Sequence, residues 1–203
     1  MPSSSLDLRI DIGAARDQGP RPTCLSFSLS DTHQIAASIK ELLSPESLHR
    51  LAARSAQKPP TEALTIAQAT DGLTHHGQTT EVAWPYNFEN PLDGGCTYHR
   101  VTAAILPFTH GIAVEALEAG RPVSLIIDVD LAFFGCKKKT SIDFDQACQI
   151  QGRHAVVLCG VRGFAKNLEY LIKNSWGLNW GDSGYAWITS RYVLSRSPQL
   201  IRI

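Results

Sequence analysis

One cysteine in this sequence stands where protein chemistry favours a nucleophile. Cys24 follows the turn-rich run Arg16–Thr23 and opens a segment with a helical pattern. Unsatisfied N–H groups and the positive end of a helix dipole stabilise a thiolate, which is the reactive form of the side chain. The dipole contributes only about 0.3–1 kcal/mol, so a partner base is needed. Taken alone, such a cysteine is most often a small buried apolar residue.

Two further stretches supply partners for this thiol. His154 stands at the head of the apolar run 154–161, and Asn174 lies in a dense Trp-, Gly- and Asn-containing stretch, 170–185, that packing alone does not explain. A metal site is a weaker alternative. Cys96 and His99 form a C-x-x-H pair, but the sequence has no second paired motif to complete a zinc site.

The three stretches together resemble the papain-like cysteine peptidases. His154 lies 130 residues and Asn174 lies 150 residues after Cys24, and that family's spacing is about 130–150 residues. The resemblance extends through Leu43–Glu46 and Trp84–Tyr86, and covers most of the chain.

The resemblance implies a role for each residue. Cys24 would be the nucleophile and His154 its base, forming a thiolate–imidazolium pair across a cleft. Asn174 would orient the imidazole, and Trp176 would shield that hydrogen bond from water. Gln18, six residues before Cys24, would donate to the oxyanion together with the backbone N–H of Cys24. The implied reaction is acyl transfer from a protein substrate to water, with no metal or organic cofactor.

Other positions bear on substrate binding. Ile126 and Ala155 match the family's apolar second-subsite wall, although core packing explains them equally well. Arg153, next to His154, suggests a preference for acidic substrates. The sequence also departs from the family: Lys58–Thr61 replaces a glycine pair that binds substrate backbone. Arg21 stands where relatives have a disulfide-bonded cysteine.

The first half of the chain predicts helices that would position Cys24. Apolar or small residues spaced four and three apart from Leu25 to Leu43 predict one helix from Cys24 to Leu43. Ser44 can cap a second helix that has Pro45 in its first turn and ends near Ala53. A third helix is expected over about 61–75.

The second half predicts strands. After a short helix, 114–119, the expected strands are 122–127, 154–161, 169–173, 185–189 and 199–203. The fold class is therefore α+β, a papain-like two-lobed fold in one domain, 1–203. The helical lobe would cover about 14–106. The sheet-rich, barrel-like lobe would cover about 107–203 plus the N-terminal segment, with the cleft between the lobes.

Composition limits which binding partners and which cellular compartment we expect for this protein. The chain has 203 residues, with 19 Lys plus Arg and 19 Asp plus Glu, so no net charge favours nucleic acid or an anionic membrane. No signal peptide is recognisable. The five widely spaced cysteines favour reduced thiols, and therefore a chain that is synthesised in the cytoplasm. A Cys136–Cys148 bridge stays open as an alternative.

The biological setting is an expectation from the resemblance. Because the matching region begins within the first residues, we expect no inhibitory propeptide. This favours a bacterial effector or toxin of narrow specificity, delivered by a specialised secretion route and paired with an inhibitor or immunity protein that occupies the cleft. Two alternatives use the same site: a deamidase or transamidase, and an inactive binding module with this fold.

Overall fold

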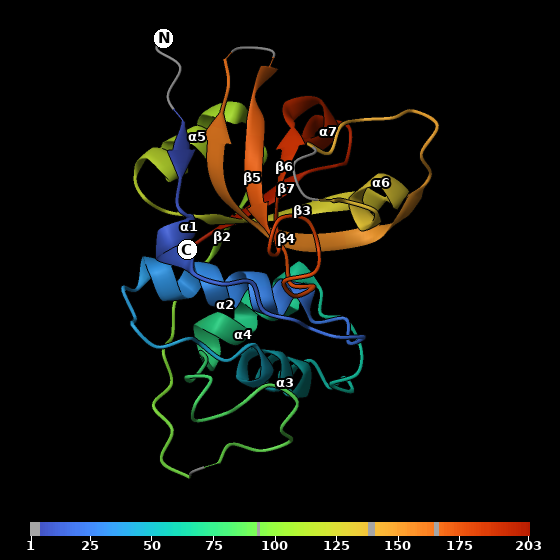
Figure 1. Cartoon of the computed structure of the whole chain (residues 1–203). Coiled ribbons are helices and arrows are strands. Elements are labelled where there is room, and N and C mark those ends of the chain that lie inside the picture. The colour runs from blue at the N-terminus through green and yellow to red at the C-terminus, as the bar shows by residue number, and fades with distance from the viewer. Residues whose placement is uncertain (1–4, 93, 138–140, 165–166) are drawn as a thin grey trace.

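The computed structural model describes residues 5–92, 94–137, 141–164 and 167–203 (Figure 1). The helices are α1 (Arg9–Ile12), α2 (Cys24–Ala36), α3 (Pro45–Ser55), α4 (Ile66–His75), α5 (His110–Glu118), α6 (Leu131–Phe134) and α7 (Ser190–Leu194). The strands are β1 (Leu6–Asp7), β2 (Ala104–Pro107), β3 (Val123–Asp130), β4 (Ile150–Arg162), β5 (Glu169–Lys173), β6 (Tyr185–Thr189) and β7 (Gln199–Arg202).

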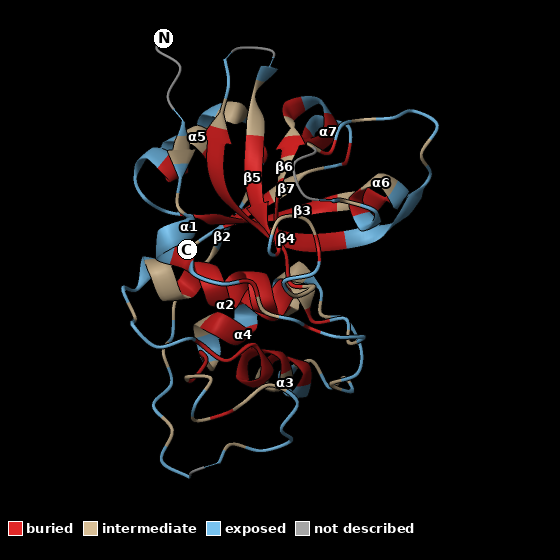
Figure 2. Cartoon of the chain, in the orientation of Figure 1, coloured by how far each residue is buried: buried red, intermediate tan, exposed pale blue. Residues whose placement is uncertain are grey.

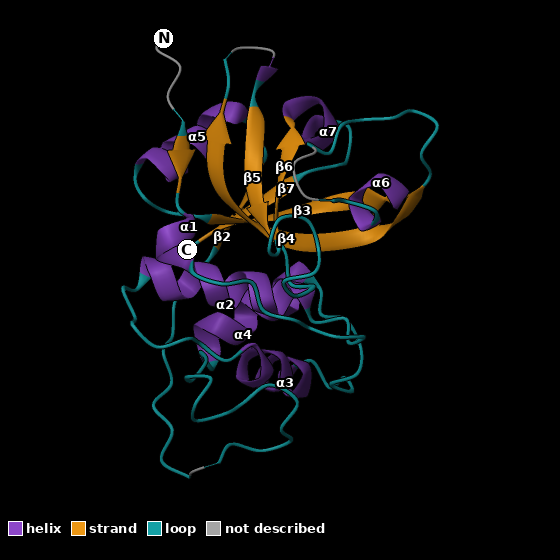
Figure 3. Cartoon of the chain, in the orientation of Figure 1, coloured by secondary structure: helices purple, strands orange, loops and turns teal. Residues whose placement is uncertain are grey.

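Helices and strands occupy separate parts of the molecule, which confirms the α+β class. Figure 3 shows α2, α3 and α4 on one side and the sheet on the other, with α5, α6 and α7 around the sheet. The buried residues of α2 face the base of the sheet (Figure 2). The sheet has the strand order β2-β7-β3-β4-β5-β6, and β1 pairs with β4.

The second lobe is the expected sheet, and this sheet is open, not closed into a barrel. Its edge strands in the described part of the chain are β2 and β6, which do not pair with each other. The β6 edge is instead met by an isolated bridge between Ile142 and Ile188. Short strands with glycine turns are common to barrels and open sheets, and the sequence does not show which strands meet.

Helix α2 begins at Cys24 as predicted but ends at Ala36, seven residues before Leu43. The chain turns at Ser38, which has a left-handed φ of 54°. Leu43 forms a bridge with Thr80 instead of a helical turn. The apolar spacing continues beyond the end of the helix because Leu43, although not helical, is also buried in this lobe.

The other two helices of this lobe follow their capping signals. Ser44 accepts a hydrogen bond from the N–H of Ser47, and Pro45 opens α3 as predicted. Helix α4 starts at Ile66, not near Thr61, because Thr65 and Gln68 form a reciprocal capping box. The predicted start was therefore five residues too early.

The strand that carries the histidine is longer than expected. β4 begins at Ile150, so His154 lies inside it and not at its head. β3 also continues past Ile127 to Asp130, since its acidic end pairs along β4 in register Asp128↔Arg153 and Ile126↔Ala155. This register sets Ile126 and Ala155 side by side against the helical lobe, in one cluster with Leu25.

Candidate active site

Cys24 is the first residue of α2 and lies against the sheet. The thiol meets the backbone N–H groups of Ala155, Leu25 and Cys24 itself. Burial raises the pKa of the Cys24 thiol, and these N–H groups act in the opposite direction. Thr23 gives no side-chain cap to the helix, because its hydroxyl is paired with the Tyr86 hydroxyl at 2.7 Å. The first turn of α2 therefore keeps its N–H groups for a negative charge.

His154 is held from its far side by Asn174. The distance between His154 Nε2 and Asn174 Oδ1 is 2.7 Å. The same oxygen accepts the N–H of Ser175 at 2.8 Å, which fixes the orientation of the amide. Nε2 must then carry the proton, and Nδ1 is the ring nitrogen that can accept one. Burial lowers the pKa of His154 to about 4, against the opposing effect of the Asn174 bond.

Aromatic side chains surround the imidazole. The Trp176 ring centre lies 4.6 Å from that of His154, and Phe133 meets the ring edge-on at 5.8 Å. Phe134 stacks on Trp176, with the two ring centres 4.9 Å apart. These rings keep water from the His154–Asn174 bond, where a low dielectric strengthens it.

Gln18 lies beside the Asn174 segment. Its backbone N–H donates to the carbonyl of Ser175 at 2.8 Å, and its Oε1 accepts from the Ser175 hydroxyl at 2.6 Å. Nε2 donates one hydrogen to the carbonyl of Arg21 at 2.7 Å. An amide nitrogen carries two hydrogens, so the second stays available to an oxyanion.

A groove of about 340 Å³ runs past Cys24 and is lined from both halves of the chain. Ile126, Ala155 and Leu25 form an apolar wall, and His154 also lines the groove. Ala63–Ile66 also lines the groove, just after the segment 58–61 where the sequence departs from the family pattern. The Thr65 capping box could have located this segment, since it fixes where α4 begins.

Arg153 lines the same groove, but its charge is engaged elsewhere. Nη1 donates to Asp128 at 2.9 Å, and Nη2 donates to the Gln199 side chain at 2.9 Å and to the carbonyl of Ser197 at 3.0 Å. This arrangement weakens the reason to expect that Arg153 attracts acidic substrates.

The sequence of this chain matches that of a known protein family. The sequence model described as papain family cysteine protease matches residues 3–195. The chain belongs to this family. It is 31% identical to cathepsin S from Bos taurus over 121 residues, which is 56% of this chain and 35% of that protein. It is 24% identical to thiol protease SEN102 from Hemerocallis sp. over 198 residues, which is 91% of this chain and 54% of that protein.

The fold has a close counterpart among solved structures. The procathepsin B S9 structure from Trypanosoma congolense superposes with a TM-score of 0.79 at 16% identity, over 98% of this chain and 77% of that one. The chain spans about a third to a half of the length of the cathepsin S and SEN102 proteins.

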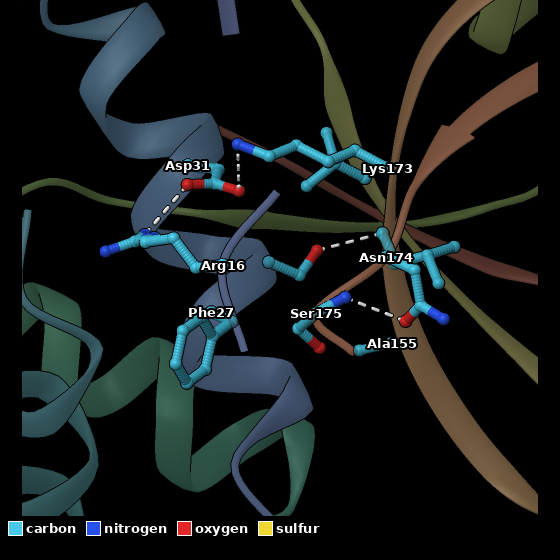
Figure 4. Close-up of a pocket in the computed structure, with 10 residues that line it drawn as sticks. Arg16, Phe27, Asp31, Ala155, Lys173, Asn174 and Ser175 are labelled. Carbon is cyan, nitrogen blue, oxygen red and sulfur yellow. Dashed lines mark hydrogen bonds and ion pairs between the residues drawn. The ribbon is translucent and has the colours of Figure 1, made fainter. Parts of the chain in front are cut away.

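Behind Asn174 this papain-family chain has a buried charge network (Figure 4). The Lys173 ammonium lies 2.9 Å from Asp31 of α2 and donates to the carbonyl of Ile12 at 2.9 Å. Arg16 meets the other oxygen of Asp31 at 2.8 Å. The network joins α2, β5 and the N-terminal segment, and so holds Asn174 relative to the helix that carries Cys24.

A small cavity of about 10 Å³ lies among these groups, which is about the space that one water molecule occupies. Within the described residues, Arg16 Nε and Asn174 Nδ2 are buried without a hydrogen-bond partner. Both residues line the cavity.

Other features concern the cysteines, metals and membranes. Cys136 and Cys148 are free thiols, so the alternative bridge does not form between them. Across the described ranges, no three His, Cys, Asp or Glu side chains converge as metal ligands. In the same ranges, no helix is long and apolar enough to cross a bilayer.

Proposed function

We propose that this chain is a cysteine endopeptidase that hydrolyses peptide bonds in protein substrates. The observation that carries the proposal is the groove itself. Cys24 at the head of α2 and His154 of β4 line it together, and Asn174 Oδ1 lies 2.7 Å from His154 Nε2. Nucleophile, base and base-orienting group are the parts that acyl transfer requires.

In this proposal the pair works as thiolate and imidazolium. Burial separately favours the neutral thiol and the neutral imidazole. Proton transfer from Cys24 Sγ to His154 Nδ1 creates two opposite charges together, each of which offsets the desolvation of the other. The N–H groups around the sulfur and the Asn174 carbonyl further stabilise the two charged forms.

The reaction then proceeds in two acyl transfers. The Cys24 sulfur attacks the scissile carbonyl, and the oxyanion takes hydrogen bonds from Gln18 Nε2 and the Cys24 N–H. The C–N bond breaks as the imidazolium gives its proton to the leaving amine. Water then gives one proton to His154 and attacks the thioester carbonyl. The C–S bond breaks, the product leaves as a carboxylic acid that ionises in solution, and the Cys24 thiolate and His154 imidazolium are restored.

The groove favours a substrate with an apolar side chain close to the scissile bond. Its walls near Cys24 are the side chains of Ile126, Ala155 and Leu25, faced by the segment 63–66. Burial of one such side chain contributes about 1.5–3 kcal/mol. Protein substrates supply these side chains on an extended backbone.

The decisive test is intact mass after incubation with an epoxysuccinyl peptide, which alkylates activated thiols. One adduct is expected on the wild type and on Cys136→Ala, and none on Cys24→Ala or His154→Ala. No adduct on folded wild type would contradict the peptidase and favour a binding module. If a protein substrate gained about one dalton and was not cleaved, the reaction would be deamidation and not proteolysis, because OH then replaces NH₂ in the substrate.

We extend the proposal to the biological setting. The peptidase acts as a bacterial effector or toxin, made in the cytoplasm and delivered outside, and an immunity protein blocks its groove. The apolar walls beside Cys24 that accept a substrate side chain can also accept an inserted inhibitor segment. Expression in a bacterial host should slow growth for wild type and not for Cys24→Ala. Equal growth of the two strains would remove the toxin role.

A further inference from the structure

Glu46 is a fully buried carboxylate in the first turn of α3 that takes no part in the proposed chemistry. Its Oε1 accepts from Arg50 Nε at 2.6 Å and from Arg21 Nη2 at 3.1 Å. Its Oε2 accepts from Arg21 Nη1 at 2.5 Å and from the Asn87 N–H at 3.0 Å. Burial, which raises a carboxyl pKa, is outweighed by the bonds from Arg21, Asn87 and Arg50, so the pKa of Glu46 is lowered. Glu46 is therefore a charged anchor inside the helical lobe.

Arg21 connects this anchor to the oxyanion-binding side chain. Its guanidinium also donates to Asn87 Oδ1 at 3.1 Å and lies 5.0 Å from the centre of the Tyr86 ring. The carbonyl of Arg21 accepts from Gln18 Nε2 at 2.7 Å and from the Thr23 N–H at 2.8 Å. One residue thus binds Glu46 with its side chain and Gln18 with its main chain.

The turn is also held at Gln18 by the carbonyl and the hydroxyl of Ser175. Pro20 and Pro22 have no backbone N–H, so they cannot donate hydrogen bonds to hold the turn. Another external support is Tyr86, whose hydroxyl donates to the carbonyl of Gln18 at 2.8 Å and lies 2.7 Å from the Thr23 hydroxyl. Tyr86 is also the ring that Arg21 covers, so the supports from Glu46 and Tyr86 meet at the guanidinium.

We propose that Glu46, through the guanidinium of Arg21, is a positioning residue that holds the Gln18 amide where the oxyanion forms. This rests on the proposed peptidase function. Without the carboxylate, the guanidinium loses its two strongest contacts and the turn 18–23 relaxes. A displacement of about 1 Å in a catalytic group can cost about 10² in rate, and loss of one oxyanion donor costs about 10²–10³.

The main test is Glu46→Gln, assayed on a peptide substrate after competent sites are titrated with the epoxysuccinyl peptide. We expect kcat to fall about 10- to 100-fold with KM within about twofold, since the lost interaction belongs to the transition state. Alkylation of Cys24 by iodoacetamide, which forms no oxyanion, should keep its rate and pH profile. A kcat equal to that of wild type, or an equal fall in alkylation rate, would overturn the proposal.

Arg50 provides the matched control. Arg21→Gln and Arg50→Gln each remove one cation from the same buried carboxylate, but only Arg21 touches the turn. We expect Arg21→Gln to lower kcat as Glu46→Gln does, and Arg50→Gln to keep kcat within about twofold. Equal losses in the two variants would mean that the ion pair acts only through stability. Arg21→Lys keeps the positive charge but cannot form the bidentate contact. Its kcat should therefore lie between those of the wild type and Arg21→Gln.

A double-mutant cycle separates this proposal from the one on which it rests. In a Gln18→Ala background, Glu46→Gln should cause little further loss of kcat, because the donor that it positions is gone. Additive losses would contradict positioning. A wild type that neither cleaves peptides nor reacts at Cys24 would instead defeat the peptidase function itself.

Discussion

The two lobes place their halves of the active site by different physical means. The helical lobe, which carries Cys24, has buried polar groups in its interior, among them His33, His49 and Glu46. The β lobe, which contains the sheet, holds His154 through the Asn174 hydrogen bond and through aromatic packing against Phe133 and Trp176. Hydrogen bonds are directional and respond to protonation, whereas packing responds to volume. The same catalytic pair should therefore be vulnerable to pH on one side and to cavities on the other.

The buried histidines show the polar side of this contrast. His49 Nδ1 lies 3.2 Å from the Ser26 hydroxyl, two residues after Cys24, and His49 Nε2 lies 3.0 Å from the carbonyl of Pro60. His33 Nδ1 meets the Gln78 amide at 2.8 Å. Burial lowers the pKa of each of these two histidines to about 4, so both are neutral near pH 7.

The aromatic packing around His154 in the β lobe is centred on α6. Phe133 is fully buried, and its carbonyl accepts from the Trp180 indole at 3.0 Å. Asp130 caps α6 through the Phe133 N–H at 3.1 Å and is itself paired with Arg196. The ring that touches His154 is thus fixed by a cap and by packing, without a polar contact to the imidazole.

The largest expected effect tests whether the two lobes act as one unit. Cys24→Ala and His154→Ala should each lower kcat by at least about 10⁴-fold, because neither partner works without the other. The double variant should be no worse than either single variant. Steady-state kinetics on a fluorogenic peptide measure this, and a further multiplicative loss in the double variant would show that the residues act independently.

A cavity in the β lobe should be the next largest effect. Phe133→Ala is expected to lower the free energy of unfolding by about 3–5 kcal/mol. It should also raise the pKa of His154 from its low value, because water reaches the ring. Urea unfolding and NMR titration of the imidazole measure the two quantities.

The matched change in the helical lobe is Leu48→Ala, which truncates another fully buried side chain at a cost of about 2–5 kcal/mol. It should leave the titration of His154 in place. If both variants moved the His154 pKa equally, packing around the ring would not be the cause.

Acid should act more strongly on the helical lobe, where burial lowers the pKa of two histidines, His33 and His49, than on the β lobe, where it lowers the pKa of His154. The unfolded chain protonates His33 and His49 near pH 6.5, while the folded chain does so near pH 4. The unfolded state binds more protons over this window, so stability falls as the pH drops from about 6.5 to 4, by up to about 3 kcal/mol per histidine. Hydrogen exchange should show α2 and α3 losing protection before β3 and β5. The variant His49→Gln should reduce this dependence, and parallel loss in both lobes would argue against it.

The smallest effect is expected at the groove rim. Arg153→Ala should change kcat/KM by no more than about twofold for substrates with either Glu or Leu near the scissile bond. Its charge is already engaged by Asp128, and such partly exposed pairs contribute about 0–1 kcal/mol. A tenfold selective loss with the Glu substrate would restore the acidic preference.

The elements with strong local signals were predictable. The bounds of β5 and β6 agree with the predicted 169–173 and 185–189, since each is a short apolar run between turn residues. The start of α3 followed from Ser44 and Pro45. Elements without such signals were missed, including β1, β2, α6 and α7. Helices α6 and α7 are only four and five residues long, and stretches of that length carry too little periodicity to detect.

The residue types and spacing by themselves determined the family, the α+β class and the candidate set of Gln18, Cys24, His154 and Asn174, because each depends on local chemistry or on the resemblance. Only the tertiary structure decided the rest. The open sheet, the groove wall at 63–66, the partners of Arg153 and the link from Glu46 through Arg21 to the turn all join segments far apart in the chain. Contacts of that kind depend on the packing of the folded chain, which local patterns do not encode.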